Sequence, residues 1–485
     1  MIAMYEQSEI PQVNIFLANR ENTEPIIINP EKFPVALVEI AEVLRQLTQT
    51  LNPVEFVTAS PESIKQEKSA IFEAYTRGVK YNPQFEYPSI ENSNIDVASV
   101  RTQITTLLKE VRRLSITSDA DRIAKVALYF KLKDDLATVM LIDGIATRDE
   151  HKIKTALNTK YAPTDSGLVA QANQRYRELT RGDSESKKSD TETVLSTEQQ
   201  EFLKKKKIDA LGIKAGFEWL LDKYGILRTT ENNHGFRVVL SEDATAIDVR
   251  DKSTEPMTIY IPKDREVTAD KLLELMYHEI EGHARQSMNG EKYIVGGGSL
   301  KIDDETMYEG LAKRLDEDYQ RRFFGVDSGQ PIPHYTQAIE MAENGNDFYS
   351  IFASQVDIRL HVLLHRPPEE TLNHESEDVK AKLQKAMDLA WNTAYRVMRG
   401  HTDTSNPTGF AFAKDLAYLR GWLSDRELRK TGNAHYNEAA IMQTNALALI
   451  GRIDITEEDL PYPFRNFTEE YCMKELLPKL GKSSG

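Results

Sequence analysis

The stretch Tyr277-His278-Glu279-Ile280-Glu281-Gly282-His283 sets two imidazoles and a carboxylate close together in a segment whose pattern predicts a helix. Its histidines are five residues apart, one more than in the HExxH motif of many zinc proteases. At about 100° per residue, five steps leave the second side chain roughly 140° round an α-helix from the first. Both histidines can bind one ion only if the helix widens locally. A π-type turn would do this, and Gly282 supplies backbone freedom for it.

The flanking sequence predicts that this motif lies in a buried helix beside a small sheet. Val267 to Asp270 offer capping side chains, and the helix is expected to run to about Met288. Its apolar face is formed by Leu272, Leu273, Leu275, Met276 and Ile280.

Three segments upstream, 236–241, 246–250 and 257–262, are rich in β-branched and aromatic residues and predict short strands. In zinc peptidases of this general plan, an edge strand beside the metal pairs with an extended substrate. We expect Met257 to Ile261 to be that edge strand.

A zinc hydrolase needs a third protein ligand and leaves a fourth position for water. Glu309 is the best candidate, because Glu305 to Leu315 has helical periodicity and follows the motif after the loop Gly296-Gly297-Gly298. Spacing alone leaves two interpretations open. HExxxH is short enough to arise by chance in a surface helix, and Glu309 would then be an ordinary solvated carboxylate.

A second constellation, Asp357, His361 and His365, forms one helical stripe with metal-ligand spacing. No carboxylate directly follows either histidine to act as a base, and the segment ends at Pro367-Pro368. We therefore interpret these histidines as packed or capping residues.

Several separated stretches of the chain resemble the family of microtubule-associated tyrosine carboxypeptidases and their bacterial relatives, which carry a Gln-Glu-Gly-Leu-Ala motif. Members have His-Glu-Ile-Gly-Thr-His where this chain has the segment 278–283, with the same HExxxH spacing. The chain has Tyr308-Glu309-Gly310-Leu311-Ala312 in place of the second motif and keeps its glutamate. The segments 81–87, 396–400 and 412–421 are also similar. The resemblance extends from about residue 60 to about residue 425.

The resemblance implies a zinc carboxypeptidase that removes a C-terminal aromatic residue, tyrosine or phenylalanine. Its metal ligands would be His278, His283 and Glu309, with Glu279 as the general base. A carboxylate next to a metal site can take a proton from the attacking water and pass it to the leaving amine. Two alternatives stay open: a zinc endopeptidase of the same architecture, and a metal-binding interaction protein without catalysis.

A carboxypeptidase must also recognise a free α-carboxylate, for which a fixed cation in bidentate geometry is suited. The candidates are Arg396, Arg399, Lys414 and Arg420, each of which is otherwise an ordinary surface charge. Tyr418 is a candidate donor to the tetrahedral oxyanion, or else a packed tyrosine.

The chain departs from the family pattern at two places beside the predicted metal. Glu281 replaces a glycine and Gly282 a threonine, which places an extra carboxylate near the metal. Tyr308 replaces a glutamine before the ligand glutamate and is expected to alter the contacts around the metal or the wall of the substrate pocket.

Composition limits the partners and the compartment. The 485 residues carry a formal charge of −15 with a pI near 5.3, which argues against nucleic-acid binding and attraction to anionic membranes. A signal peptide and an 18-residue apolar run are not found in the sequence. The single cysteine, Cys472, fits a reducing cytoplasm. We expect a cytoplasmic protein that acts on a peptide or protein C-terminus.

The expected fold is α+β and predominantly α-helical, with a zinc-peptidase-like domain in which a small sheet lies beside the HExxxH helix. Helices are predicted over 35–75 and 97–180, joined by an irregular link from Tyr81 to Pro88. We divide the chain into a helical N-terminal region (1–180), a flexible charged linker (181–207) and the catalytic domain (208–485). Few apolar anchors and the run Lys204-Lys205-Lys206-Lys207 mark the linker.

Overall fold

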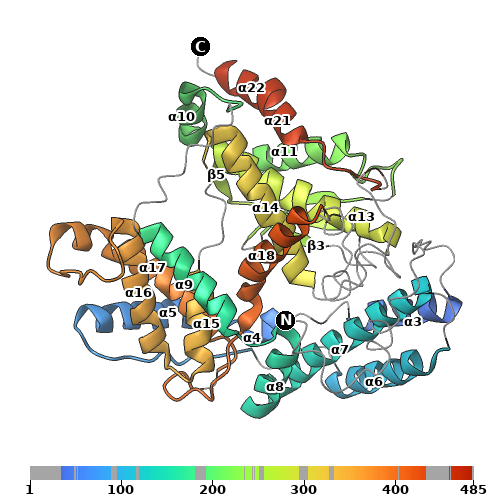
Figure 1. The fold of residues 1–485 in the computed structure, drawn as a ribbon, viewed down its shortest axis with the longest axis horizontal. Helices are drawn as coiled ribbons and strands as arrows, with labels where there is room; N and C mark the ends of the chain where they lie inside the picture. Colours follow the sequence, from blue (N-terminus) through green and yellow to red (C-terminus); the bar gives the residue numbers. More distant parts are fainter. Residues whose placement is uncertain are drawn as a thin grey trace.

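The computed structural model shows a predominantly helical protein with two small sheets (Figure 1). It describes residues 34–482 except 49–50, 52, 89–95, 116–118, 181–192, 234, 243, 245, 251–255, 294–303, 327–332, 402, 433–437, 439–457 and 459. The loop Gly296-Gly297-Gly298 and the first part of the predicted linker lie outside the described residues. The predicted α+β class with a majority of helix is confirmed.

The described part of the N-terminal region, from residue 34 onward, is mainly helical, as predicted. Its elements are α3 (Val35–Thr48), α4 (Pro53–Val57), α5 (Pro61–Thr76), α6 (Val97–Arg113), α7 (Asp119–Thr147), α8 (Glu150–Tyr161) and α9 (Ser166–Thr180). The residues 81–88 between α5 and α6 have no regular structure, which confirms the expected link. In α6, Ile104, Leu107 and Val111 recur at helical spacing and are buried against α3 and α7.

The described part of the predicted linker is ordered, and the expectation of a flexible segment up to residue 207 is wrong there. Helix α10 (Thr197–Lys205) begins with a capping box between Ser196 and Gln199 and buries Leu203. Strand β1 (Lys207–Asp209) follows directly and leads into α11 (Ala210–Lys223). The lysine run therefore spans the end of a capped helix and the start of a strand.

The three predicted strands form one sheet. Strands β2 (Arg237–Ser241), β3 (Asp248–Arg250) and β4 (Thr258–Pro262) have the order β2-β4-β3. Strand β4 pairs in parallel with β2 and antiparallel with β3, with Val249 opposite Ile259. Both edges of β4 are occupied by backbone hydrogen bonds, so the expectation that 257–261 forms the edge strand is wrong. The edge strand on the side of the HExxxH helix is β3, which contacts that helix.

The HExxxH motif lies in a long helix that changes its hydrogen bonding midway. Strand β5 (Glu266–Thr268), which pairs with β1, leads into α12 (Ala269–Leu275), the π-helix η3 (Met276–Ala284) and α13 (Arg285–Tyr293). Thr268 is the N-cap residue, although its side chain makes no capping hydrogen bond. Leu272, Met276 and Ile280 are fully buried, and each such side chain contributes about 1.5–3 kcal/mol to stability.

The remaining described helices are α14 (Asp304–Phe324), α15 (His334–Glu343), α16 (Phe348–Leu364), α17 (Glu377–Val397), η5 (Ala413–Asp415), α18 (Leu416–Lys430), α21 (Phe467–Tyr471), η7 (Cys472–Leu476) and α22 (Leu477–Lys482). One apolar core contains residues from every helix between α10 and α14, from the sheet and from the C-terminal helices. A second core joins α5 and α9 to α15, α16 and α17, which lie together at the lower left of Figure 1. The packing therefore crosses the predicted domain boundary at residue 208.

Helix α18 connects these two parts of the molecule and crosses α14 at close range. A Cβ atom added at Gly310 would lie 2.5 Å from the carbonyl oxygen of Gly421. The crossing therefore requires glycine at position 310, directly after the predicted ligand Glu309. None of the described helices is both long and apolar enough to cross a bilayer.

We expect Gly310→Ala to lower the free energy of unfolding by about 1–3 kcal/mol, because the added methyl group must push two backbones apart. Denaturant unfolding followed by circular dichroism measures the change. Gly481→Ala is the matched control, since a Cβ atom at this helical glycine would meet nothing within 4 Å. Equal stability of the two variants would contradict the close crossing.

Candidate metal centre

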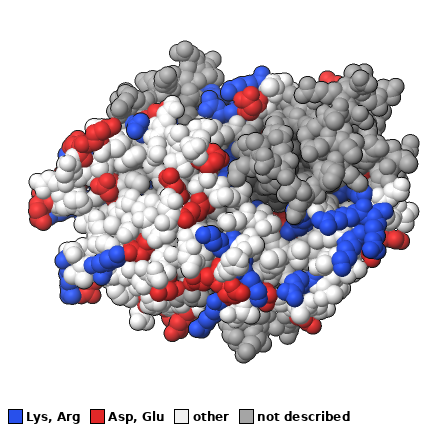
Figure 2. Space-filling model, turned by 60° about the horizontal axis from the view of Figure 1, so that its bottom comes forward, with Lys and Arg blue, Asp and Glu red and all other residues white. Residues whose placement is uncertain are grey.

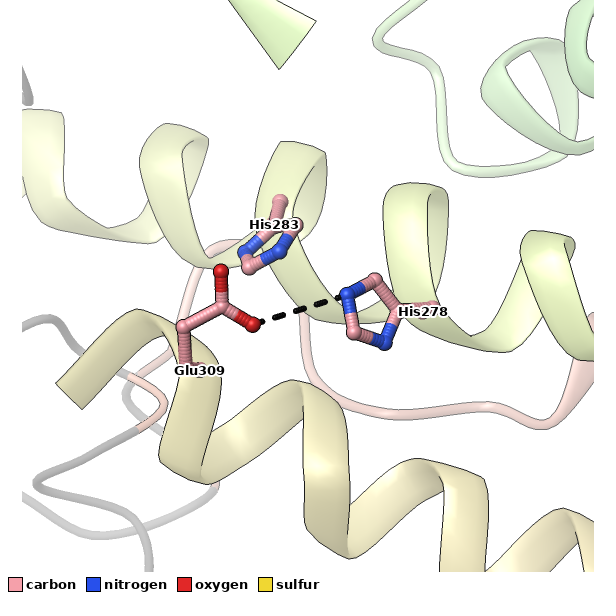
Figure 3. A group of neighbouring side chains, drawn as sticks. All are labelled: His278, His283 and Glu309. Atoms are coloured by element: carbon pink, nitrogen blue, oxygen red, sulfur yellow. Dashed lines mark ion pairs between the residues drawn. The ribbon is translucent and has the colours of Figure 1, made fainter. Parts of the chain in front are cut away.

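His278, His283 and Glu309 come together from two helices. Both histidines project from η3, and Glu309 points at them from α14 (Figure 3). Each of the three offers a ligand atom, and these atoms all lie within 4.8 Å of one another. The Nε2 atom of His278 is 3.7 Å from Oε2 of Glu309. The three residues predicted as ligands thus form one cluster, the only such group of three or more among the residues that the structure describes.

The π-helix explains how histidines five residues apart share one face. With i→i+5 hydrogen bonding, the turn holds more residues, and the two imidazole centroids lie 4.9 Å apart. The predicted local widening is confirmed. Gly282 also serves packing, because a Cβ atom there would lie 3.3 Å from Cα of Ala312 on α14. This close approach brings η3 within reach of Glu309.

Asp316 orients the first histidine and was not predicted from the sequence. Nδ1 of His278 lies 3.2 Å from both carboxylate oxygens of Asp316, which directs Nε2 toward Glu309. Lys313 contacts the same carboxylate at 2.8 Å. Burial opposes the charge on Asp316, but His278 and Lys313 hold its pKa well below the usual range. Asp316 lies seven residues after Glu309, two turns along α14, and this spacing is the signal that could have found it.

We expect Asp316→Asn to weaken zinc binding roughly 10- to 100-fold, because a carboxylate fixes the ring and raises the basicity of a ligating histidine. Competition with a chromogenic zinc chelator measures the affinity. Asp318→Asn serves as the control, since Asp318 is on the same helix and pairs with Arg321. An unchanged affinity for Asp316→Asn would remove Asp316 from the site.

Tyr308, the residue that replaces the family's glutamine, packs against the second histidine. Its ring is stacked on His283 with centroids 5.0 Å apart and planes at 16°. The expectation that this replacement changes the contacts around the metal site agrees with this placement. The ring of Tyr308 therefore covers one face of the His283 imidazole.

Glu281 lies away from the cluster, so the expectation that it places an extra carboxylate near the metal is wrong. Its Oε1 atom accepts hydrogen bonds from the backbone nitrogen and the hydroxyl of Thr468, both at 2.9 Å. The side chain is fully buried on the side of η3 that faces α21. The carboxylate thus links the motif helix to the C-terminal segment.

Glu279 follows the first ligand and lies among acidic groups. Burial raises the pKa of its carboxyl group to about 7, and the carboxylates of Glu309 and Asp316 act in the same direction. Asp248 of the edge strand β3, which contacts η3, also raises the pKa of Glu279. A carboxylate in this position suits the transfer of a proton beside a metal.

Tyr418 lies beside the cluster from a third helix, α18. The Glu309 carboxylate is the main cause that raises its pKa above the usual range, and burial adds to the effect. The ammonium group of Lys313 lies 5.5 Å from the centre of its ring. The structure thus brings the predicted oxyanion donor next to the predicted ligands.

The four predicted carboxylate-binding cations have different environments. Arg396 makes a two-pronged ion pair with Asp415, and its guanidinium lies 5.3 Å from the ring of Tyr335. Arg399 lies over the ring of Tyr395 at the same distance. Lys414 belongs to the short helix η5 that precedes α18.

Arg420 holds a loop of the N-terminal region. Its guanidinium donates to the backbone carbonyls of Tyr161, Ala162 and Pro163, between α8 and α9. These hydrogen bonds occupy the guanidinium nitrogens with which Arg420 would have to bind a substrate carboxylate. We therefore interpret Arg420 as a structural residue.

The second constellation does not form a metal site in the structure. Both ring nitrogens of His361 lie 2.9 Å from backbone carbonyl oxygens, those of Asp357 and Glu370. His365 ends α16 in the left-handed conformation with φ of 53° and is exposed. The interpretation as packed and capping histidines is confirmed.

The cluster has the composition of a catalytic zinc site. Two imidazoles and one carboxylate are a known ligand set for hydrolytic zinc, with a fourth position left for water. The Asp316–His278 pair supplies the carboxylate that usually supports a ligating histidine. The residues present therefore fit zinc, and the same set also accepts cobalt, nickel or manganese.

Charges on the molecular surface are mixed. Over the described part of the face in Figure 2, acidic and basic side chains are interspersed.

No model of a protein family matches the chain, and no curated protein matches it.

Proposed function

We propose that this protein is a zinc metallocarboxypeptidase that releases tyrosine or phenylalanine from the C-terminus of peptides or proteins. The observation that supports it most is the convergence of His278, His283 and Glu309, through a π-helical turn, on one point. The resemblance to the microtubule-associated tyrosine carboxypeptidases points to the same class of reaction. We extend the proposal to membership of that family, to a zinc-peptidase-like catalytic domain and to a cytoplasmic location.

Different residues of the chain have different roles in the proposed hydrolysis. A zinc ion held by the three ligands would polarise the scissile carbonyl and acidify a water molecule. Glu279 takes the proton of the attacking water and passes it to the leaving amine. Tyr418 donates a hydrogen bond to the oxyanion that develops on the carbonyl oxygen. Asp316 keeps His278 in the orientation that presents Nε2.

Strand β3 is the element of the sheet that suits an extended peptide. It is the edge strand on the side of η3, and Asp248 in it lies close enough to act on the pKa of Glu279. An added peptide strand would carry its terminal bond past the ligands. This geometry is compatible with an exopeptidase and with an endopeptidase. The two differ in whether cleavage requires a free C-terminus on the substrate.

We expect a peptide that ends in free tyrosine to be cleaved at least roughly 100-fold faster, as kcat/KM, than the same peptide with a C-terminal amide. The loss of the charged carboxylate removes charge-assisted hydrogen bonds, which accounts for the difference. Chromatography of the released tyrosine or tyrosine amide measures both rates. Equal rates, or cleavage at internal bonds, would identify an endopeptidase. Bound zinc without any product would leave a metal-binding interaction protein.

A further inference from the structure

The surroundings of Tyr335, at the start of α15, carry an excess of positive charge in the interior. Three guanidinium groups act on this tyrosine, those of Arg396, Arg359 and Arg399, against one carboxylate, that of Asp415. Arg396 forms the ion pair with Asp415. Tyr335 is stacked near Tyr418, with ring centroids 6.4 Å apart, so this region adjoins the metal centre.

Arg359 on α16 is a buried cation without a carboxylate partner among the described residues. Arg359 is only 7% exposed. One terminal nitrogen, Nη2, donates to Thr393 at 3.3 Å, whereas Nε has no hydrogen-bond partner in the described part of the chain. Burial lowers the pKa of Arg359 to about 10. A guanidinium in this state costs stability unless an anion joins it.

Two further polar side chains beside Arg359 have atoms without partners. Gln355 lies one turn earlier on the same face of α16, is fully buried, and neither of its amide atoms forms a hydrogen bond with the described residues. His334 is 5% exposed, and its Nδ1 atom likewise lacks a partner there. Helix α15, which His334 begins, packs against α16, and the charge of Arg359 acts on the pKa of His334. Three adjacent side chains thus present unused hydrogen-bonding atoms.

The N-terminus of α15 adds to this group. The helix begins at His334, and its N-cap residue, Pro333, gives no side-chain cap. The positive end of the helix dipole therefore favours an anion beside His334.

We propose that Arg359, Gln355 and His334 form a carboxylate-binding site, and that it receives the C-terminal carboxylate of the substrate. A carboxylate is an acceptor-only group that matches the planar fork of arginine, and the amide nitrogen of Gln355 can serve a second lone pair. The second part of the inference rests on the proposed carboxypeptidase function. It assigns terminus recognition to residues outside the four cations predicted from the sequence.

The tyrosine pair connects this site with the metal centre. The rings of His334 and Tyr335 are 4.2 Å apart, and Tyr335 stacks with Tyr418, whose hydroxyl is affected mainly by Glu309. A terminal residue bound at Arg359 would have these aromatic rings beside it on the way to the ligands. Such rings suit an aromatic side chain.

Ligand binding by full-length protein, stripped of metal with a chelator, tests the site without relying on catalysis. The probes are N-acetyl-L-tyrosine, its amide, and N-acetyl-L-glutamic acid α-amide, which carries only a side-chain carboxylate. We expect N-acetyl-L-tyrosine to bind in calorimetry and to raise the melting temperature, and the tyrosine amide to bind roughly 10- to 100-fold more weakly. Preferential binding of the glutamate derivative would assign the site to acidic side chains and overturn terminus recognition.

Arg359→Met is the decisive variant. We expect it to abolish the tyrosine effect while the protein without ligand stays as stable as the wild type, because an unpaired buried charge is removed. Gln355→Leu is the second variant and should weaken binding with its fold intact. Arg426→Met is the control, since Arg426 is exposed and lies over Trp422. Binding that survives both Arg359→Met and Gln355→Leu would overturn the site.

The two proposals fail in different ways. N-acetyl-L-tyrosine binding that depends on Arg359, together with zinc but no peptide turnover, would refute the peptidase and support the carboxylate site. Turnover that prefers free over amidated peptides equally well in wild type and in Arg359→Met would support the peptidase and refute the site. If both proposals hold, Arg359→Met raises KM for free peptides by roughly tenfold or more and changes kcat less.

Discussion

Glu279→Gln is expected to lower kcat for a peptide ending in free tyrosine by about 10²- to 10⁴-fold while zinc stays bound. Glutamine has nearly the same shape as glutamate but cannot accept a proton. Both the attack of water and the departure of the amine depend on that proton transfer. Because Glu279 is not one of the clustered ligand residues, the metal content should not change.

The measurement pairs turnover with metal content on the same preparation. Glu274→Gln is the matched control, since Glu274 lies on α12 one turn before the motif and pairs with Lys271 on the surface. It should keep wild-type turnover. Preserved turnover in Glu279→Gln would refute the proposed base, and loss of zinc in it would show that Glu279 has a structural part in the cluster.

The two histidine ligands could be predicted from the sequence because the pattern that indicates them is local. The spacing of His278 and His283 demanded a widened helix, and the structure has a π-helix from Met276 to Ala284. Glu309 required information beyond spacing, since many helices carry exposed glutamates. The resemblance to a known family supplied it, and the structure brings Glu309 to the histidines.

The features that were missed depend on how elements pack. The central place of β4 follows from pairing with both β2 and β3, which alternation along a single strand cannot reveal. Glu281 sits two residues before His283, yet its direction is decided by the contact with Thr468, far along the chain. The apolar core that α5 and α9 share with α15 to α17 likewise depends on contacts between segments far apart in the chain.

Asp316 and Arg359 show a similar limit for function. Each is an ordinary charged residue on a helix in the sequence. Asp316 acquires a role because α14 faces η3, and Arg359 stands out because burial leaves it without a carboxylate among the described residues. Tertiary packing determines both.

The second large effect concerns the metal itself. His283→Ala and Glu309→Ala are each expected to lose bound zinc, because two remaining protein ligands cannot hold the ion against a chelator. The alanine side chains are smaller and uncharged, and neither replaced residue belongs to the apolar core between η3 and α14, so the fold should persist by circular dichroism. His365→Asn is the control from the rival constellation, and asparagine tolerates the left-handed conformation at that position.

Elemental analysis of tag-free protein, dialysed after reconstitution with zinc, tests the central claim most directly. We expect about one zinc per chain in the wild type and in His365→Asn, and almost none in His283→Ala and Glu309→Ala with their helical content retained. Wild-type protein that binds no zinc, or variants that keep it, would contradict the assignment of His278, His283 and Glu309 as a metal centre.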